Sequence, residues 1–132
     1  MEQAALPSTI EGVVVHGQQL GRRLGFPTAN LSPDDLQGVI PTTGVYAAIA
    51  TLQDGRRFKA MVNVGFRPTV DASRHVLTVE AHLSAFEGDL YGQRLQIVIL
   101  SRIRDERRMS SLEQLSAQLS QDLQAVNASI AL

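Results

Sequence analysis

Most of the sequence has the pattern of β-strands. Runs of apolar and β-branched residues, some of them alternating with polar residues, are separated by short segments rich in glycine and polar residues. β-Branched residues favour strands, and a period of two is typical of a strand with one buried face. The Asp54-Gly55 turn further predicts a hairpin between two of these runs. Five runs are predicted to be strands: residues 10–16, 44–52, 56–64, 76–85 and 93–103.

The last part of the sequence changes to the period of a helix. Ser110 and Glu113 match a capping box, which supports a start near Ser111. We therefore predict one helix over residues 111–127, packed on the sheet. Its buried stripe, defined by apolar residues at spacings of three and four, is Leu112, Leu115, Leu119, Leu123 and Val126.

The order of these elements favours an antiparallel barrel. The predicted strands follow one another without helices between them, whereas parallel crossovers normally need about a dozen residues or more. A chain of 132 residues also falls within the usual size of one domain. We therefore predict a single domain, residues 1–132, of the mainly β class, with one C-terminal helix.

Composition narrows the classes of partner. Twelve basic and thirteen acidic side chains give a net charge of −1, so no overall field favours nucleic acid or an anionic membrane. The chain has no tryptophan and only two tyrosines, so it offers few side chains on which nucleic-acid bases could stack. It also has no cysteine, which excludes disulfides and thiolate sites. No apolar run approaches the ~18 residues of a membrane span, and no secretory signal is visible. We expect a cytoplasmic protein without membrane or nucleic-acid partners.

The segment 17–43 is the first place to look for function. A long stretch without regular structure is unusual in a compact domain unless it has a role. Gly17, Gly21 and Gly25 are spaced so that the backbone can turn sharply and aim several N–H groups at one ligand, most obviously phosphate. The segment is neither a Walker A motif nor a dinucleotide fingerprint. Turns that need glycine for their conformation alone remain the alternative.

Thr28 and Asn30 form a second candidate in this segment. They lie two residues apart after Pro27, so an extended backbone directs both side-chain oxygens the same way. Magnesium takes a few protein oxygens together with nucleotide phosphates, and two neutral oxygens suffice where ATP supplies the charge. The alternative is a pair that only stabilises a turn.

Glu80 is the candidate for acid–base chemistry. The alternation in 76–85 places it on the more polar face of its strand, where a carboxylate can accept the proton of a hydroxyl nucleophile. The alternative is an exposed strand glutamate, or one paired with Arg67 or Arg74. His82, on the same face, is equally interpreted as a structural histidine, and no zinc-site spacing is present.

Five blocks of the sequence together resemble the riboflavin kinase family. The resemblance covers about Ile10 to Asp122, and GFPTAN, residues 25–30, is its most specific part. It implies a six-stranded antiparallel Greek-key β-barrel with a C-terminal α-helix. It also implies transfer of the γ-phosphoryl group of ATP to the 5′-hydroxyl of riboflavin, giving FMN and ADP. The blocks, in the order and spacing of the family, are GRRLGFPTANL, GVYAAIA, MVNVGFRPTV, VEAHLSAFEGDLYG and RIRDERRMSSLEQLSAQLSQD.

The resemblance also implies roles for individual residues. Glu80 matches the catalytic base, and Thr28 and Asn30 match the ligands of Mg²⁺ and phosphate. The implied ATP contacts are Gly17, Gly21, Gly25, Thr28, Asn30, His82, Leu83, Leu90 and Tyr91. The implied flavin contacts, in the charged loop before the helix, are Arg104, Glu106, Arg107 and Met109.

Two departures from the family bear on these expectations. Met109 stands where the family commonly has phenylalanine, so a thioether replaces a ring in that flavin contact. The adenylyltransferase half that usually precedes this module in bacteria is absent from the sequence, so we expect the reaction to stop at FMN unless the chain is part of a longer enzyme. The alternative function is a non-catalytic flavin- or nucleotide-binding regulatory module, although a pure binder has no need of a catalytic base. We expect a monomer.

Overall fold

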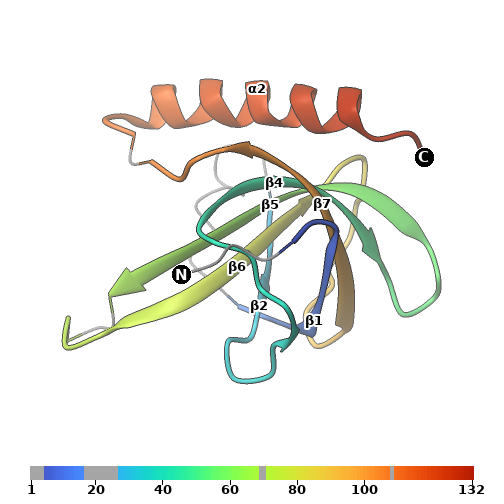
Figure 1. Cartoon of the computed structure of the whole chain (residues 1–132), viewed down its shortest axis with the longest axis horizontal. Helices are drawn as coiled ribbons and strands as arrows, with labels where there is room; N and C mark the ends of the chain where they lie inside the picture. The colour runs from blue at the N-terminus through green and yellow to red at the C-terminus, as the bar shows by residue number, and fades with distance from the viewer. Residues whose placement is uncertain (1–4, 17–26, 69–70, 108) are drawn as a thin grey trace.

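Seven strands and one long helix form the part of the chain that the computed structural model describes, residues 5–16, 27–68, 71–107 and 109–132 (Figure 1). The five predicted strands are confirmed as β1, β4, β5, β6 and β7. Two short strands, β2 and β3, lie in the segment expected to be irregular, because two or three residues are too few to show an alternation. The elements in chain order are β1 (Ser8–Val15), β2 (Ala29–Leu31), β3 (Gln37–Gly38), β4 (Gly44–Thr51), β5 (Arg57–Pro68), β6 (His75–Leu83), β7 (Arg94–Arg104) and α2 (Leu112–Ser129).

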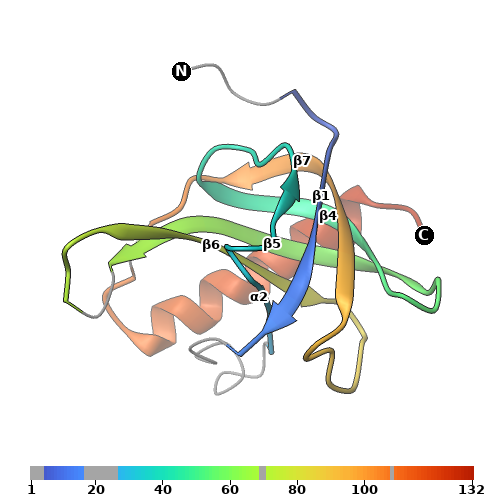
Figure 2. The ribbon, with the colours of Figure 1, turned by 90° about the horizontal axis from the view of Figure 1, so that it is seen from below.

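Six of these strands close into an antiparallel barrel. The order β2-β6-β5-β4-β7-β1 is completed by pairing of β1 with β2, and β3 pairs with β1. Strands β4, β5 and β6 are consecutive neighbours, and β7 returns to lie beside β4, which is the Greek-key connection. The curved strands enclose the core in both views (Figures 1 and 2). The predicted six-stranded Greek-key barrel is therefore confirmed.

The seam that closes the barrel is short. Strand β1 meets β2 over two residue pairs, Val14 with Leu31 and Val15 with Asn30. On its other edge β2 pairs with β6 through all three of its residues, and Asn30 lies opposite Glu80. The three residues of β2 thus connect the first strand of the barrel to the strand that carries Glu80.

Apolar side chains fill the barrel and also cover part of its outside. Val62, Val79 and Ile97, from three strands, are at most 1% exposed in the interior. A second, smaller cluster lies between the outer face of the barrel and α2, and includes Val45 and Val126. The helix packs against β4, β5 and β7 and lies along one side of the barrel (Figure 1). Burial of this outer cluster fixes the helix on the barrel.

Helix α2 begins one residue later than its predicted capping box implies. Ser111 is the N-cap, and its hydroxyl accepts from the backbone N–H of Gln114 at 3.1 Å. The side-chain oxygen of Gln114 accepts in return from the backbone N–H of Ser110 at 3.1 Å. The N-cap is therefore Ser111, and the predicted capping pair of Ser110 and Glu113 was wrong by one position. No helix in the described ranges is long and apolar enough to cross a membrane.

The buried stripe of α2 also differs from the prediction. Leu112 is 54% exposed, because it lies in the first turn, whereas the helix residues of the outer cluster begin at Leu119. Asp122 is buried instead, at 2% exposure. A carboxylate can occupy this position because Arg104 donates to it, as described below.

Candidate active site

Three polar residues lie side by side across three strands. Glu80 on β6 is opposite Asn30 on β2 and opposite Asn63 on β5. Directly opposite residues of antiparallel strands project to the same face of a sheet. Their sequence neighbours, such as Val62 and Val79, fill the barrel, so this row faces outward. The site is therefore built on the outer surface of the barrel wall, on regular strands that fix the spacing of the side chains.

The environment of Glu80 favours a proton acceptor. Its side chain is half-buried, and this burial raises the pKa of Glu80 above its ordinary value of 4.5. The positive charge of Arg67 lowers the pKa, and the negative charge of Glu106 raises it further. A raised pKa makes the carboxylate a better base when it is ionised.

The raised pKa predicts a pH-dependent effect on stability. The folded chain binds the Glu80 proton more tightly than the unfolded chain, so the stabilisation is complete below pH 4.5 and is lost as the pH rises through the raised pKa. Glu80→Gln is therefore expected to raise the Tm by a few degrees at pH 7 and by progressively less towards pH 4. Thermal unfolding across pH 4–8 measures this, with Glu87→Gln, at an exposed glutamate, as the control. A Tm difference that does not change with pH contradicts the prediction.

Thr28 enters the site from the residue before β2. It lies two positions before Asn30, and both residues line the cavity described below. The preceding Pro27 is tied to β6, because Nδ1 of His82 donates to its carbonyl oxygen at 2.8 Å. His82 was expected at the ATP side. It is 9% exposed, and its hydrogen bond to Pro27 links β6 to the residue before Thr28. This contact fixes the entry of the chain into β2 and hence the position of Thr28.

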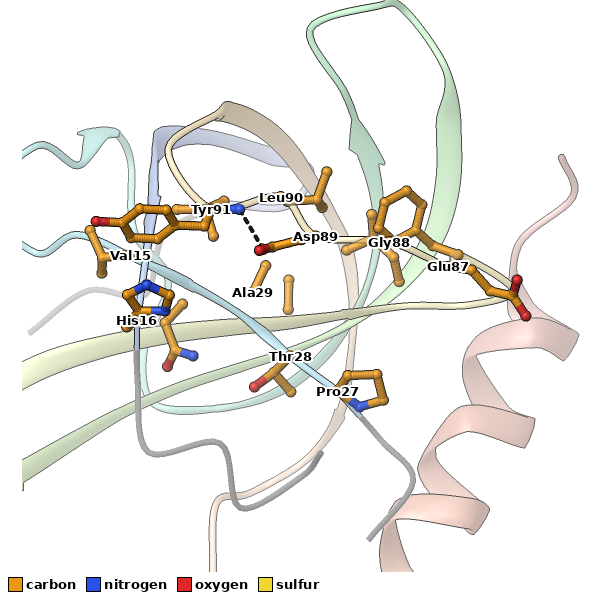
Figure 3. A pocket seen from close by; sticks show the side chains of 15 residues that line it. Val15, His16, Pro27, Thr28, Ala29, Glu87, Gly88, Asp89, Leu90 and Tyr91 are labelled. Atoms are coloured by element: carbon orange, nitrogen blue, oxygen red, sulfur yellow. Dashed lines mark hydrogen bonds between the residues drawn. The ribbon is translucent and has the colours of Figure 1, made fainter. Parts of the chain in front are cut away.

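A cavity of about 370 Å³ opens beside Thr28 and Asn30 (Figure 3). Three further predicted ATP contacts line it: Leu83, Leu90 and Tyr91. The sequence did not single out His16, whose ring stacks on Tyr91 with the centroids 3.9 Å apart and the planes 13° apart. The backbone N–H of Tyr91 donates to Asp89 at 2.9 Å, the dashed line in Figure 3. The cavity is therefore lined by both aromatic and polar groups.

The four predicted flavin contacts do not lie together in this structure. The Glu106 carboxylate lies over Gly65, where an added Cβ would collide with it, and close enough to Glu80 to affect its pKa. Arg107 and Met109 line a shallow hollow of about 540 Å³ against α2. The guanidinium of Arg104 is in an ion pair with the helix and lies in neither place.

Besides His16, two contributors to the site were missed from the sequence. Asn63 has a signal that could have found it, because the alternation in 56–64 puts it on the polar face of its strand. Gly65 allows the close approach of Glu106, and only the three-dimensional fold reveals this. The glycines predicted to cradle phosphate, Gly17, Gly21 and Gly25, lie outside the described residues.

Comparisons with known proteins agree on one family. The family model described as Flavokinase, riboflavin kinase, matches residues 4–130. The bifunctional riboflavin kinase/FMN adenylyltransferase of Pseudomonas fluorescens is 41% identical over 124 residues, which are 92% of this chain and 38% of that protein. This chain thus spans about two-fifths of the length of that curated relative.

Solved structures share the fold. A crystal structure described as a macrolide-efflux protein from Streptococcus pneumoniae gives a TM-score of 0.81 at 34% identity, over 92% of this chain and 38% of that one. Riboflavin kinase from Trypanosoma brucei gives a TM-score of 0.65 at 24% identity, over 97% and 81%. The riboflavin kinase family model covers nearly the whole of the present chain. This chain therefore belongs to the riboflavin kinase family.

Proposed function

We propose that this chain phosphorylates riboflavin at its 5′-hydroxyl with ATP, giving FMN and ADP. The observation that carries the proposal is the row of Asn30, Glu80 and Asn63 on the outer barrel wall. It places a half-buried carboxylate of raised pKa opposite Asn30, which lines the cavity. Phosphoryl transfer to an alcohol requires a base for the hydroxyl proton and, beside it, groups that hold the phosphates.

Glu80 serves as the general base in this proposal. Its carboxylate accepts the proton of the 5′-hydroxyl as the oxygen attacks the γ-phosphorus, and the bond from that phosphorus to the ADP oxygen breaks. Asn63, opposite Glu80, has an amide that can hydrogen-bond to the polyhydroxyl chain of the substrate. Fixed strand positions reduce the entropic cost of bringing these groups to the hydroxyl.

Thr28 and Asn30 suit a magnesium-bound nucleotide. In the described part of the chain, no group of three or more histidine, aspartate or glutamate side chains could hold a metal alone. The neutral oxygens of Thr28 and Asn30 therefore fit an ion that takes much of its coordination from phosphates and water. When bound with ATP, Mg²⁺ neutralises charge on the transferred group. Gly17, Gly21 and Gly25 stay predicted phosphate contacts.

The cavity beside these residues suits the nucleotide base. Its apolar lining includes Leu83 and Leu90, and the Tyr91 ring forms part of its wall. Tyr91→Ala is expected to raise the KM for ATP roughly three- to tenfold, because an aromatic contact is lost, and to leave the KM for riboflavin unchanged. Steady-state kinetics with each substrate varied measures this, and Tyr91→Phe is the matched control. Equal increases in both KM values contradict this assignment.

Formation of FMN tests the proposed function directly. The chain is incubated with riboflavin and MgATP, and FMN is separated by chromatography and quantified. A flavin- or nucleotide-binding module without catalysis would bind riboflavin and form no FMN, and that result would overturn the proposal. A cytoplasmic location, a monomeric state and the absence of a nucleic-acid partner stay predictions.

A further inference from the structure

A buried ion pair joins the end of β7 to the middle of α2. Arg104, the last residue of β7, donates from Nε to both carboxylate oxygens of Asp122 at 3.0 Å each. Its Nη2 also donates to Oδ2 of Asp122 at 2.8 Å. The exposed fractions of these side chains are 18% for Arg104 and 2% for Asp122, the lowest of the ion pairs in the described ranges.

Gln118 extends these contacts to the loop that follows β7. Its Nε2 donates to Oδ1 of Asp122 at 2.9 Å, and its Oε1 accepts from Nη2 of Arg107 at 2.7 Å. Gln118 and Asp122 lie four residues apart and therefore share one face of α2. Asp122 and Gln118, on one face of the helix, thus bind the first and the last residue of segment 104–107, Arg104 and Arg107.

The residue between these two arginines that matters most is Glu106. Its carboxylate lies over Gly65 and close enough to Glu80 for their charges to interact. Gly65 belongs to β5, next to the strand that carries Glu80. The contacts from α2 therefore set where segment 104–107 passes beside the candidate active site.

The start of the same segment is held from the barrel. Arg102 donates to Oδ1 of Asp105 at 2.6 Å and to the hydroxyl of Tyr46 at 2.8 Å. The Tyr46 hydroxyl in turn donates to the carbonyl oxygen of Thr42 at 2.7 Å. Side chains from the barrel and the helix thus hold the segment where strand pairing has ended.

Packing alone does not require an ion pair under the helix. Desolvation offsets much of the attraction of a buried pair, and apolar residues of similar volume often stabilise a fold equally well. Val126 of the helix and Ile130, the residue that follows it, already pack on the barrel through apolar contacts. The distinctive contribution of Asp122 is direction, because a guanidinium gripped through two carboxylate oxygens has a fixed orientation.

We propose that Asp122 and Gln118 are positioning residues for riboflavin binding. From α2 they hold segment 104–107 beside Glu80, so that the segment is ordered before the flavin arrives. This inference rests on the proposed function and extends it to two helix residues that do not themselves contact the reacting atoms. Preorganisation of this kind improves affinity because less ordering remains for the ligand to bring about.

The test compares Gln118→Ala and Asp122→Asn with the wild type. Riboflavin affinity is measured directly by quenching of flavin fluorescence, and the KM values for riboflavin and ATP are measured separately. Gln118→Ala is expected to weaken riboflavin binding roughly fivefold, and Asp122→Asn roughly tenfold or more, because hydrogen bonds to charged groups are lost. The KM for ATP stays within about twofold, because neither Gln118 nor Asp122 nor their two arginine partners line the cavity.

Matched controls separate positioning from general destabilisation. Gln124→Ala changes an exposed glutamine of the same helix. Asp35→Asn breaks an arginine–aspartate pair, Arg94 with Asp35 at 3.0 Å, elsewhere on the barrel. Both controls are expected to bind riboflavin like the wild type, and circular dichroism with thermal unfolding is recorded for every variant.

The outcomes decide the proposal in either direction. If Gln118→Ala, which leaves the buried pair intact, binds riboflavin as tightly as the wild type, the proposal is overturned. It is also overturned if Asp122→Asn lowers the Tm without weakening riboflavin binding, or raises both KM values equally. A wild type that binds riboflavin without forming FMN contradicts the kinase function instead, and the affinity series still decides the role of Asp122 and Gln118.

Discussion

Replacing Glu80 with glutamine is expected to lower kcat for FMN formation by about 10²- to 10⁴-fold, the range that a positioned general base contributes. Glutamine keeps the size and hydrogen-bonding capacity of the side chain and cannot accept the proton of the hydroxyl. Binding of riboflavin and of MgATP should therefore change little. Initial rates at saturating substrates, with direct measurement of riboflavin affinity, test this expectation.

Asn63→Asp provides a contrasting variant for the same row. It places a second carboxylate directly opposite Glu80, so it changes charge in the site without removing the base.

A Glu80→Gln variant that retains more than about a tenth of the wild-type kcat contradicts the assignment of Glu80 as base. In that case positioning and charge stabilisation alone would account for the rate.

Thr28→Ala is expected to lower kcat at least about 100-fold while riboflavin binding is largely kept. The physical reason is that Thr28 and Asn30 line the cavity proposed for the nucleotide, whereas the predicted flavin contacts Arg107 and Met109 line a different hollow against α2. Turnover and riboflavin affinity are measured over a range of Mg²⁺ concentrations.

Two variants sharpen the test at Thr28. Thr28→Ser retains the oxygen and should keep most of the activity, whereas Thr28→Val retains the shape without the oxygen and should resemble Thr28→Ala. Turnover of Thr28→Ala that equals the wild type at saturating Mg²⁺ would remove Thr28 from the site. Loss of riboflavin binding in the same variant would point to a collapsed β2 instead.

The sequence predicted the face of Glu80, because local alternation determines it, whereas the expected common direction of Thr28 and Asn30 stays a prediction. It did not predict that Asn30 and Glu80 are neighbours, since that depends on the register between β2 and β6. Strand β2 itself was missed, because three residues show no period. The resemblance to a known family, more than periodicity, linked these distant segments.

The helix shows a different limit of local patterns. Spacing correctly predicted α2, yet it placed Leu112 in the stripe and left out Asp122, whose burial depends on Arg104, 18 residues earlier in the chain. Arg104, the last residue of β7, stays a predicted flavin contact, and its pairing with Asp122 is a second partner that no local pattern indicates. The burial of Asp122 and the position of the Arg104 side chain both depend on this contact between distant parts of the chain.

The short seam between β1 and β2 ties the existence of the site to the completion of the barrel. Asn30 has Val15 on one side and Glu80 on the other, so one residue both closes the barrel and belongs to the proposed site. If β1 separates from β2, Asn30 loses its partner on one side and keeps only the pairing of β2 with β6. Local opening of this short seam is therefore expected to loosen the proposed site while the rest of the barrel stays folded.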